Sequence, residues 1–405
     1  MPSELLDIAP QRVAEVHAHS SDLVVHTPLL SAASLSRELG GQLLLKAENL
    51  QRTGSFKLRG ALSKLHALDG HCAGVVAASA GNHGQALAFA ARARGLPCTV
   101  YMPHGAALAK IAATRAFGAT VELGGESVEQ CIERAHTRAQ ADRLAFVHPF
   151  DDEAVILGQA GVGLELLRDL PSLGEVIVPI GGGGLAGGLA AMVKAERPEV
   201  RVIGVQAARC APFVRGSGQE PAPVAVGTIA DGIAVKRPGR LTRPLVERYV
   251  DEIVTVEEHW IAEAMVLLIE RSKLVVEGAG AVGLAALLSG AAGCARSGAT
   301  VLVLSGGNVD VRVLSEVTRR HETKVGRRLR LQTRVADRPG GLAALLARVA
   351  DADANVIEVE HLRDGVDTDV SVAAVELTVE TGGAAEAERL LSLLAAASYD
   401  VTLLH

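Results

Sequence analysis

The chain has 405 residues, of which 49% are hydrophobic and 21% charged, and its formal net charge is −6. This composition is typical of a globular protein with two or three domains, and we expect no nucleic-acid binding, which favours a clustered basic face. The first twenty residues lack a basic start followed by an apolar run, so we expect a cytoplasmic protein without a secretory signal. The longest uncharged stretch, 278–295, is rich in Gly and Ala, and we favour a buried helix over a membrane span.

The five cysteines are odd in number and form no CxxC pair. They are therefore interpreted as reduced core thiols of a reducing compartment, and not as a disulfide or zinc framework.

Short apolar runs alternate with longer helical patterns over most of the chain. Strands are expected at 42–46, 74–78, 98–102, 120–123, 175–179, 201–206 and 301–304. Helices are expected at 81–94, 107–117, 128–143 and 185–196. This alternation predicts an α/β fold with doubly wound parallel sheets covered by helices on both faces. The continuously apolar strands agree with burial on both sides.

The pattern changes near residue 320. Segment 319–330 is rich in Arg and Lys and is interpreted as a solvated linker, with a nucleic-acid patch as the alternative. Six elements follow, which are expected at 331–335, 340–350, 356–361, 370–379, 384–397 and 401–404. Their order is βαββαβ, as in ferredoxin-like domains. We therefore predict a first domain over 1–320 with a smaller lobe at about 50–150, a linker over 321–330, and a second domain over 331–405.

Four glycines, Gly181 to Gly184, stand directly between the strand at 175–179 and the helix that begins at Leu185. Such a loop lets the backbone approach an anion closely, and the helix N-terminus adds favourable partial charge. The loop lacks the Lys-Ser/Thr ending of a nucleoside triphosphate site. We favour phosphate binding over a plain tight turn.

Three further segments carry candidate chemistry. Lys57 lies in a Gly/Ser-rich segment and is either a nucleophilic lysine, if desolvated, or a surface lysine. Ser79, Asn82 and His83 follow a strand at a helix start, which is either an anion-binding turn or a capped helix. The turn that begins at Ser305 follows the last strand, and ligands of open α/β sheets bind beyond such strand ends.

The motifs SFKLRGA, SAGNHG, GGGGL and SGGN, in this order and at these intervals, resemble those of the threonine dehydratase and serine racemase family of pyridoxal-phosphate enzymes. The resemblance covers roughly residues 20–320 and implies a two-lobed, tryptophan synthase β-like fold that binds pyridoxal 5'-phosphate. The second domain resembles an ACT domain, an amino-acid-sensing module. In it, Asp337 to Gly340 follow the first strand and Asn355 opens the second, as the ligand loop of that module would.

The resemblance implies a role for each matching residue. Lys57 would bind the cofactor covalently and later move the Cα proton, and Phe56 would lie against the pyridine ring. Asn82 would bind the ring hydroxyl, and Ser305 would face the pyridine nitrogen. The phosphate would lie against Gly181, Gly182, Gly183, Gly184 and Leu185. The substrate carboxylate would lie near Ser79, Asn82 and His83.

Two neighbouring segments are matched less closely. Glu277 matches an acidic position near the site of the family, although Gly278 replaces the usual proline. The loop at 228–232 resembles one that closes the site. Asp151 and Asp152 are interpreted as a loop or helix start in preference to an acid–base pair.

The implied reaction removes water and then ammonia from L-threonine or L-serine, giving 2-oxobutanoate or pyruvate. Racemases of the family have a serine where this chain has Ala80, which has no proton to give, so we favour dehydration. A serine racemase, a dehydratase of another 3-hydroxy amino acid and a non-catalytic sensor remain alternatives.

Regulation and assembly are implied in the same way. An amino-acid effector, with isoleucine or valine as first guesses, and a dimer or tetramer are expected by resemblance, with a role in isoleucine biosynthesis. Segment 206–212, where relatives bind a divalent cation, has no carboxylate, so no metal is expected.

Overall fold

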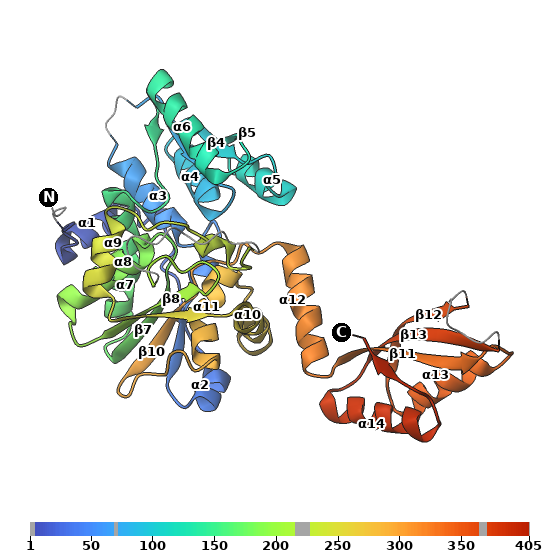
Figure 1. Cartoon of the computed structure of the whole chain (residues 1–405). Coiled ribbons are helices and arrows are strands. Elements are labelled where there is room, and N and C mark those ends of the chain that lie inside the picture. The colour runs from blue at the N-terminus through green and yellow to red at the C-terminus, as the bar shows by residue number, and fades with distance from the viewer. Residues whose placement is uncertain (1–4, 69–71, 215–226, 364–370, 405) are drawn as a thin grey trace. The chain divides into compact units, whose positions relative to one another are not determined.

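Residues 5–68, 72–214, 227–363 and 371–404 are described by a computed structural model, in which the chain divides into two units, Met1–Asp310 and Val311–His405 (Figure 1). A six-stranded sheet forms the centre of the first unit. Its strands, in spatial order, are β1 (Leu29–Ser31), β2 (Leu43–Lys46), β10 (Ala299–Val303), β7 (Leu173–Pro179), β8 (Arg201–Ala207) and β9 (Glu252–Val256). All neighbours are parallel except β1 and β2.

Helices cover both faces of this sheet. Val176 and Val178 pack in one buried cluster with Leu189 of α8 (Gly184–Glu196). A Cβ at Gly283 of α11 (Gly278–Leu288) would lie 3.6 Å from Ile177, between those two valines in the strand. Because successive strand residues point to opposite faces, α8 and α11 lie on opposite sides, and the doubly wound arrangement is confirmed.

The uncharged stretch predicted as a buried helix begins with α11, which is buried from Gly278 to Leu287. No helix in the described part of the chain is long and apolar enough to span a membrane.

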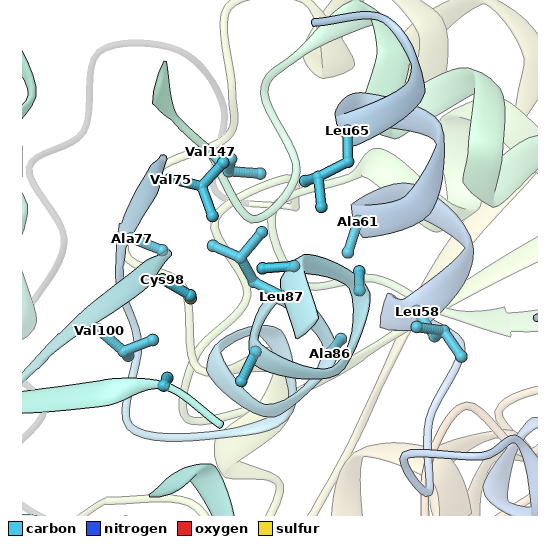
Figure 2. Close-up of a cluster of buried hydrophobic side chains, with 14 of the residues drawn as sticks. Leu58, Ala61, Leu65, Val75, Ala77, Ala86, Leu87, Cys98, Val100 and Val147 are labelled. Carbon is cyan, nitrogen blue, oxygen red and sulfur yellow. The ribbon is translucent and has the colours of Figure 1, made fainter. Parts of the chain in front are cut away.

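A second, fully parallel sheet lies within the segment predicted as the smaller lobe. Its spatial order is β5 (Thr120–Leu123), β4 (Cys98–Met102), β3 (Val75–Ala78) and β6 (Ala145–Phe146). Its helices are α4 (Asn82–Ala93), α5 (Leu108–Ala116) and α6 (Val128–Asp142). Figure 2 shows Leu58, Ala61 and Leu65 of α3 (Lys57–His66) in one core with Leu87 and Val75. Packing in this core therefore fixes the helix that begins at Lys57.

The remaining elements of the first unit connect these sheets. They are α1 (Pro10–His19), α2 (Ala33–Leu39), η1 (Glu48–Leu50), α7 (Glu153–Asp169), η2 (Asp231–Ile233), α9 (Thr242–Tyr249) and α10 (Glu258–Ser272).

All five cysteines are free thiols, as predicted, but the expected burial in the core is correct for only two of them. Cys98 and Cys131 are buried, whereas Cys72, Cys210 and Cys294 are partly exposed, because these three lie in connections between elements.

Four charged side chains, each at most 2% exposed, form a buried ion network that consists of Lys46, Glu48, Arg59 and Glu165. The Arg59 guanidinium donates to Glu48 at 2.8 Å and to Glu165 at 2.7 Å. The Lys46 ammonium donates to Glu165 at 2.6 Å. The network joins α3 to β2, η1 and α7, and charged groups lie this deep only when paired.

The second unit has the predicted βαββαβ order. Its elements after the first helix are β11 (Arg328–Ala336), α13 (Gly341–Asp351), β12 (Asn355–Leu362), β13 (Val372–Glu380), α14 (Ala384–Ala396) and β14 (Thr402–Leu403). The sheet is antiparallel in the order β12-β13-β11-β14. Val370, predicted to open the third strand, lies outside the described residues.

The prediction of a linker over 321–330 is wrong, because most of this segment is helix or strand. Helix α12 (Val311–Lys324) reaches into it, β11 begins at Arg328, and the two units divide at Asp310 and Val311. Arg319, Arg320 and Lys324 belong to this helix, which is amphipathic: Arg320 pairs with Glu316 at 2.8 Å, one turn away, while Val317 is buried. Arg328 and Arg330 belong to β11.

Candidate active site

A cavity of about 970 Å³ opens in the first unit and is lined by residues of both sheets. All eleven residues predicted for the site line it: Phe56, Lys57, Ser79, Asn82, His83, Gly181, Gly182, Gly183, Gly184, Leu185 and Ser305. Three of the four segments that carry them follow the carboxyl ends of β3, β7 and β10, as expected for ligand sites of parallel sheets, and the segment with Phe56 and Lys57 follows η1.

Lys57 is the first residue of α3, and its side chain extends into the cavity. Its ammonium donates to the carbonyl oxygen of Pro149 at 2.8 Å and lies 5.0 Å from the centre of the Phe56 ring. Burial lowers the pKa of Lys57 to about 8, although the negative charge of Glu277 opposes this shift. A neutral, nucleophilic amine is therefore accessible close to neutral pH.

The loop before Lys57 pairs with the segment after β10. Ser55 forms a β-bridge with Gly306, and the Phe56 N–H donates to the carbonyl oxygen of Ser305 at 3.1 Å. Gly54 has a φ of +74°, and a Cβ there would overlap the side-chain amide of Asn308. Segments far apart in the sequence thus place Lys57 and Ser305 in one wall of the cavity.

The glycine-rich loop offers backbone N–H groups at the start of α8. Gly183 is the N-cap with a φ of +95°, which favours glycine. A Cβ at Gly182 would overlap the ring of Phe150. The carbonyl of Gly182 accepts a hydrogen bond from Thr242 Oγ1 at 2.5 Å, which ties the loop to the start of α9. This cradle, which side chains would fill, fits the phosphate of a cofactor.

A second helix N-terminus, that of α4, lines the cavity. Ser79 Oγ accepts a hydrogen bond from the Gly81 N–H at 3.2 Å. The His83 ring donates from Nε2 to the carbonyl oxygen of Val147 at 2.9 Å, and burial lowers the pKa of His83 to about 3. The ring is thus neutral and bound within the lobe, so an anion here meets the backbone N–H groups of the helix start.

Three side chains form a hydrogen-bonded chain on the cavity wall. Asn308 Nδ2 donates to the carbonyl oxygen of Thr53 and to Asn82 Oδ1, both at 2.8 Å. Asn82 Nδ2 donates to Glu277 Oε1 at 2.7 Å. Burial, reinforced by the charge of Asp231, raises the pKa of Glu277 to about 8. Sequence analysis missed Asn308, although it lies in the same SGGN motif as Ser305.

The loop at 228–232 borders the cavity and packs against Gly278, so it accounts for a glycine at this position in place of the expected proline. A Cβ at Gly278 would overlap the carbonyl group of Ile229, so a proline would not fit this loop. Asp231 of the same loop pairs with Lys110 of α5 at 2.5 Å.

The segment before α7 contributes aromatic rings, not paired acids. Phe150 lines the cavity, and His148 accepts the Asp151 N–H at 2.7 Å. Asp151 accepts backbone N–H groups of Arg240 and Leu241, while Asp152 caps α7. The interpretation of the two acids as a loop and helix start is confirmed. Within the described ranges, no group of three or more His, Cys, Asp or Glu side chains is arranged to bind a metal ion.

Comparison with known proteins gives one family. Residues 20–306 match the model of the family described as "Pyridoxal-phosphate dependent enzyme". L-threonine ammonia-lyase of Thermotoga maritima is 42% identical over 398 residues, which cover 97% of this chain and 99% of that protein.

Two of the solved structures that resemble this one illustrate the similarity. The T.th. threonine deaminase has a TM-score of 0.68 and 40% identity, over 74% of this chain and 98% of that one. Maize serine racemase has a TM-score of 0.72 and 32% identity, over 79% of this chain and 99% of that one. The 42% identity to the ammonia-lyase extends through both units, whereas the family model ends within the first.

Proposed function

The chain belongs to the family of pyridoxal-phosphate dependent enzymes, and on this basis we propose that it is an ammonia-lyase that converts L-threonine, and L-serine, to 2-oxobutanoate or pyruvate and ammonia. The observation that carries this proposal is a buried lysine with a pKa of about 8, facing a glycine-rich helix N-terminus in one cavity. The 42% identity to a named L-threonine ammonia-lyase over 97% of the chain supports the choice of substrate.

The residues present suit the cofactor. Lys57 would hold it covalently, with Phe56 against its ring, and the N–H groups of Gly181, Gly182, Gly183, Gly184 and Leu185 would bind its phosphate. Asn82 would bind the ring hydroxyl and Ser305 would face the ring nitrogen. When bound, pyridoxal 5'-phosphate withdraws electrons from the substrate and so acidifies its Cα proton.

Proton transfer is then assigned to Lys57. Because the pKa of Lys57 is about 8, its amine is neutral in a fraction of the molecules near this pH and would accept the Cα proton at Nζ. The carbonyl oxygen of Pro149 would hold the Lys57 amine in place. Ser79 and the start of α4 would hold the substrate carboxylate. The β-hydroxyl on the adjacent carbon would take up a proton and leave as water, and hydrolysis of the released enamine would give the 2-oxo acid and ammonia.

The resemblance to maize serine racemase makes racemisation the second candidate. Ala80 lines the cavity at the position where the racemases carry a serine, and its methyl group cannot donate a proton to the opposite face of Cα. We therefore expect little or no D-serine from L-serine.

The test measures 2-oxo acid release from L-threonine and L-serine together with the visible absorption of the purified holoenzyme. Lys57→Ala is expected to lose both the absorption of covalently bound cofactor and the activity. Lys64→Ala is the matched control, because Lys64 lies on the same helix but pairs with Asp152 away from the cavity. An active, coloured Lys57→Ala enzyme would refute the assignment, and absorption without 2-oxo acid release would refute the substrate.

We also propose that the second unit is an ACT domain that binds an amino-acid effector. Its βαββαβ order supports this proposal, as does the position of Asp337 to Gly340 between β11 and α13, with Asp337 paired to Arg363 at 3.2 Å. Asn355 opens β12. Changes in threonine KM on addition of isoleucine or valine would test it.

We further propose a cytoplasmic dimer or tetramer with a role in isoleucine biosynthesis. Composition and the two buried thiols support a reducing compartment. Sedimentation of the holoenzyme would give its oligomeric state.

A further inference from the structure

We infer that Asn308 is a positioning residue that sets the polarity of the Asn82 amide, so that Asn82 presents an N–H group, and not its carbonyl oxygen, to the ring oxygen of the cofactor. This inference rests on the proposed function and assigns Asn308, which that function leaves without a role.

The chain of bonds starts at a backbone atom. The carbonyl oxygen of Thr53 can only accept, so the Asn308 atom 2.8 Å away is the nitrogen Nδ2. The same nitrogen lies 2.8 Å from Asn82, and its second hydrogen points there. The Asn82 atom that faces Asn308 must therefore be the oxygen Oδ1, because two amide nitrogens cannot bond to each other.

Asn82 Nδ2 is consequently the atom of this amide that does not face Asn308. One of its two hydrogens serves Glu277 Oε1 at 2.7 Å, which leaves the other for a ligand. Asn82 lines the cavity, as does Asn308. A donor at this place stabilises negative charge on a ligand oxygen, whereas a carbonyl would repel it.

Glu277 alone could not set this polarity. Because its pKa lies near 8, the carboxyl group carries a proton over much of the neutral range, and a protonated carboxyl can donate as well as accept. Both orientations of Asn82 would then be compatible with Glu277. The orientation is thus decided at the other end of the chain, where Thr53 offers only an acceptor.

The position of Asn308 is itself constrained by the loop that precedes Lys57. The Gly307 N–H donates to the carbonyl oxygen of Gly54 at 2.9 Å. A Cβ at Gly54 would overlap the Asn308 side chain, so this amide packs directly on the glycine. The same contacts therefore connect Asn308 to the lysine loop and to Asn82.

The test replaces Asn308 by leucine, which keeps the size of the side chain but removes both donors, and in a second variant by alanine. Asn49→Leu is the matched control: Asn49 is buried beside Gly307 and donates to the Val275 carbonyl at 3.1 Å, but does not line the cavity. Pyridoxal 5'-phosphate is added to each apo-protein, and its affinity and the pH dependence of its bound absorption are measured.

Both Asn308 variants are expected to bind the cofactor about tenfold more weakly and to shift the titration of its ring by about one pH unit or more, since one hydrogen bond to a charged oxygen is lost. Asn49→Leu should match the wild type in both measurements. Wild-type affinity and titration in the Asn308 variants, or an equal shift in Asn49→Leu, would overturn the inference while leaving the proposed function intact. Failure of the wild type to bind the cofactor would instead refute the proposed function.

Discussion

The buried imidazole of His83 donates a hydrogen bond from Nε2 to the carbonyl oxygen of Val147. Burial, together with the positive charge of Lys57, lowers its pKa to about 3, from 6.5 in an unfolded chain. An imidazole of this kind stays neutral in the folded protein while the unfolded chain takes up a proton below pH 6.5. Acid therefore favours the unfolded state.

This difference predicts the pH dependence of stability. The contribution of His83 is fully present above pH 6.5 and is lost progressively as the pH falls toward 3, with about 2 kcal/mol lost by about pH 5. Urea unfolding at about pH 7.5 and about pH 5 measures the loss. His83→Gln, which can still donate to Val147, should reduce it by about 2 kcal/mol. The exposed His104 is the control: the free energy of unfolding of His104→Gln should fall between these two pH values by as much as that of the wild type. If it falls by as much in His83→Gln as well, the assignment to His83 is contradicted.

Sequence analysis placed His83 in the site but could not give its protonation state. The ring is neutral because of its burial and the nearby charge of Lys57, and these, like its hydrogen-bond partner Val147, 64 residues away, come from the fold. Asn308 was missed for the same kind of reason, since its partners Thr53 and Asn82 lie 255 and 226 residues away. Motifs reveal which side chains reach a site, whereas charge states and hydrogen-bond directions depend on contacts that only the fold creates.

Among the elements, the glycine-rich turn into α8 offers the sharpest test. A Cβ at Gly182 would overlap the Phe150 ring, so Gly182→Ala should displace the ring or the loop and weaken binding of pyridoxal 5'-phosphate by about tenfold or more. Titration of the apo-protein with the cofactor measures this effect. Gly283→Ala on α11 is the control, because its Cβ would make only ordinary contacts at 3.6 Å. Equal affinities for the two variants would show that the cradle does not need a bare backbone.

In the described part of the first unit, the strands that sequence analysis found each have four or more residues. It missed β1 and β6, which have three and two residues, and β9, which carries Glu252 and is only partly buried. It also took part of α12 for a linker, because its many basic residues hide an apolar stripe with a single buried residue, Val317. Short or polar elements are stabilised by contacts with neighbouring strands and helices, and the local sequence pattern does not reveal these contacts.

At the scale of the whole molecule, the division at Asp310 predicts that catalysis resides in the first unit. The T.th. threonine deaminase matches over 98% of its length yet covers only 74% of this chain. A chain that ends at Asp310 should therefore bind the cofactor and release 2-oxobutanoate at a rate within about threefold of the full chain, while losing any response to isoleucine or valine. Steady-state assays of both chains measure this. A folded but inactive first unit would show that the second unit is needed for catalysis itself.

The sequence predicted the architecture of both units, because alternation and strand-end motifs are local signals that this fold satisfies. It could not predict which distant segments share a wall of the cavity, such as the pairing of Ser55 with Gly306.

The buried ion network also limits how this chain can change. Its two cations and two anions come from β2, η1, α3 and α7, and their charges cancel. Replacing any one of them by a neutral residue leaves a net charge in the interior, at a cost of about 3–5 kcal/mol, a large part of the stability of an ordinary domain. Substitutions at Lys46, Glu48, Arg59 and Glu165 are thus expected to accumulate only in compensating pairs. A designer who grafts the Lys57 helix onto another scaffold would have to graft these partners with it.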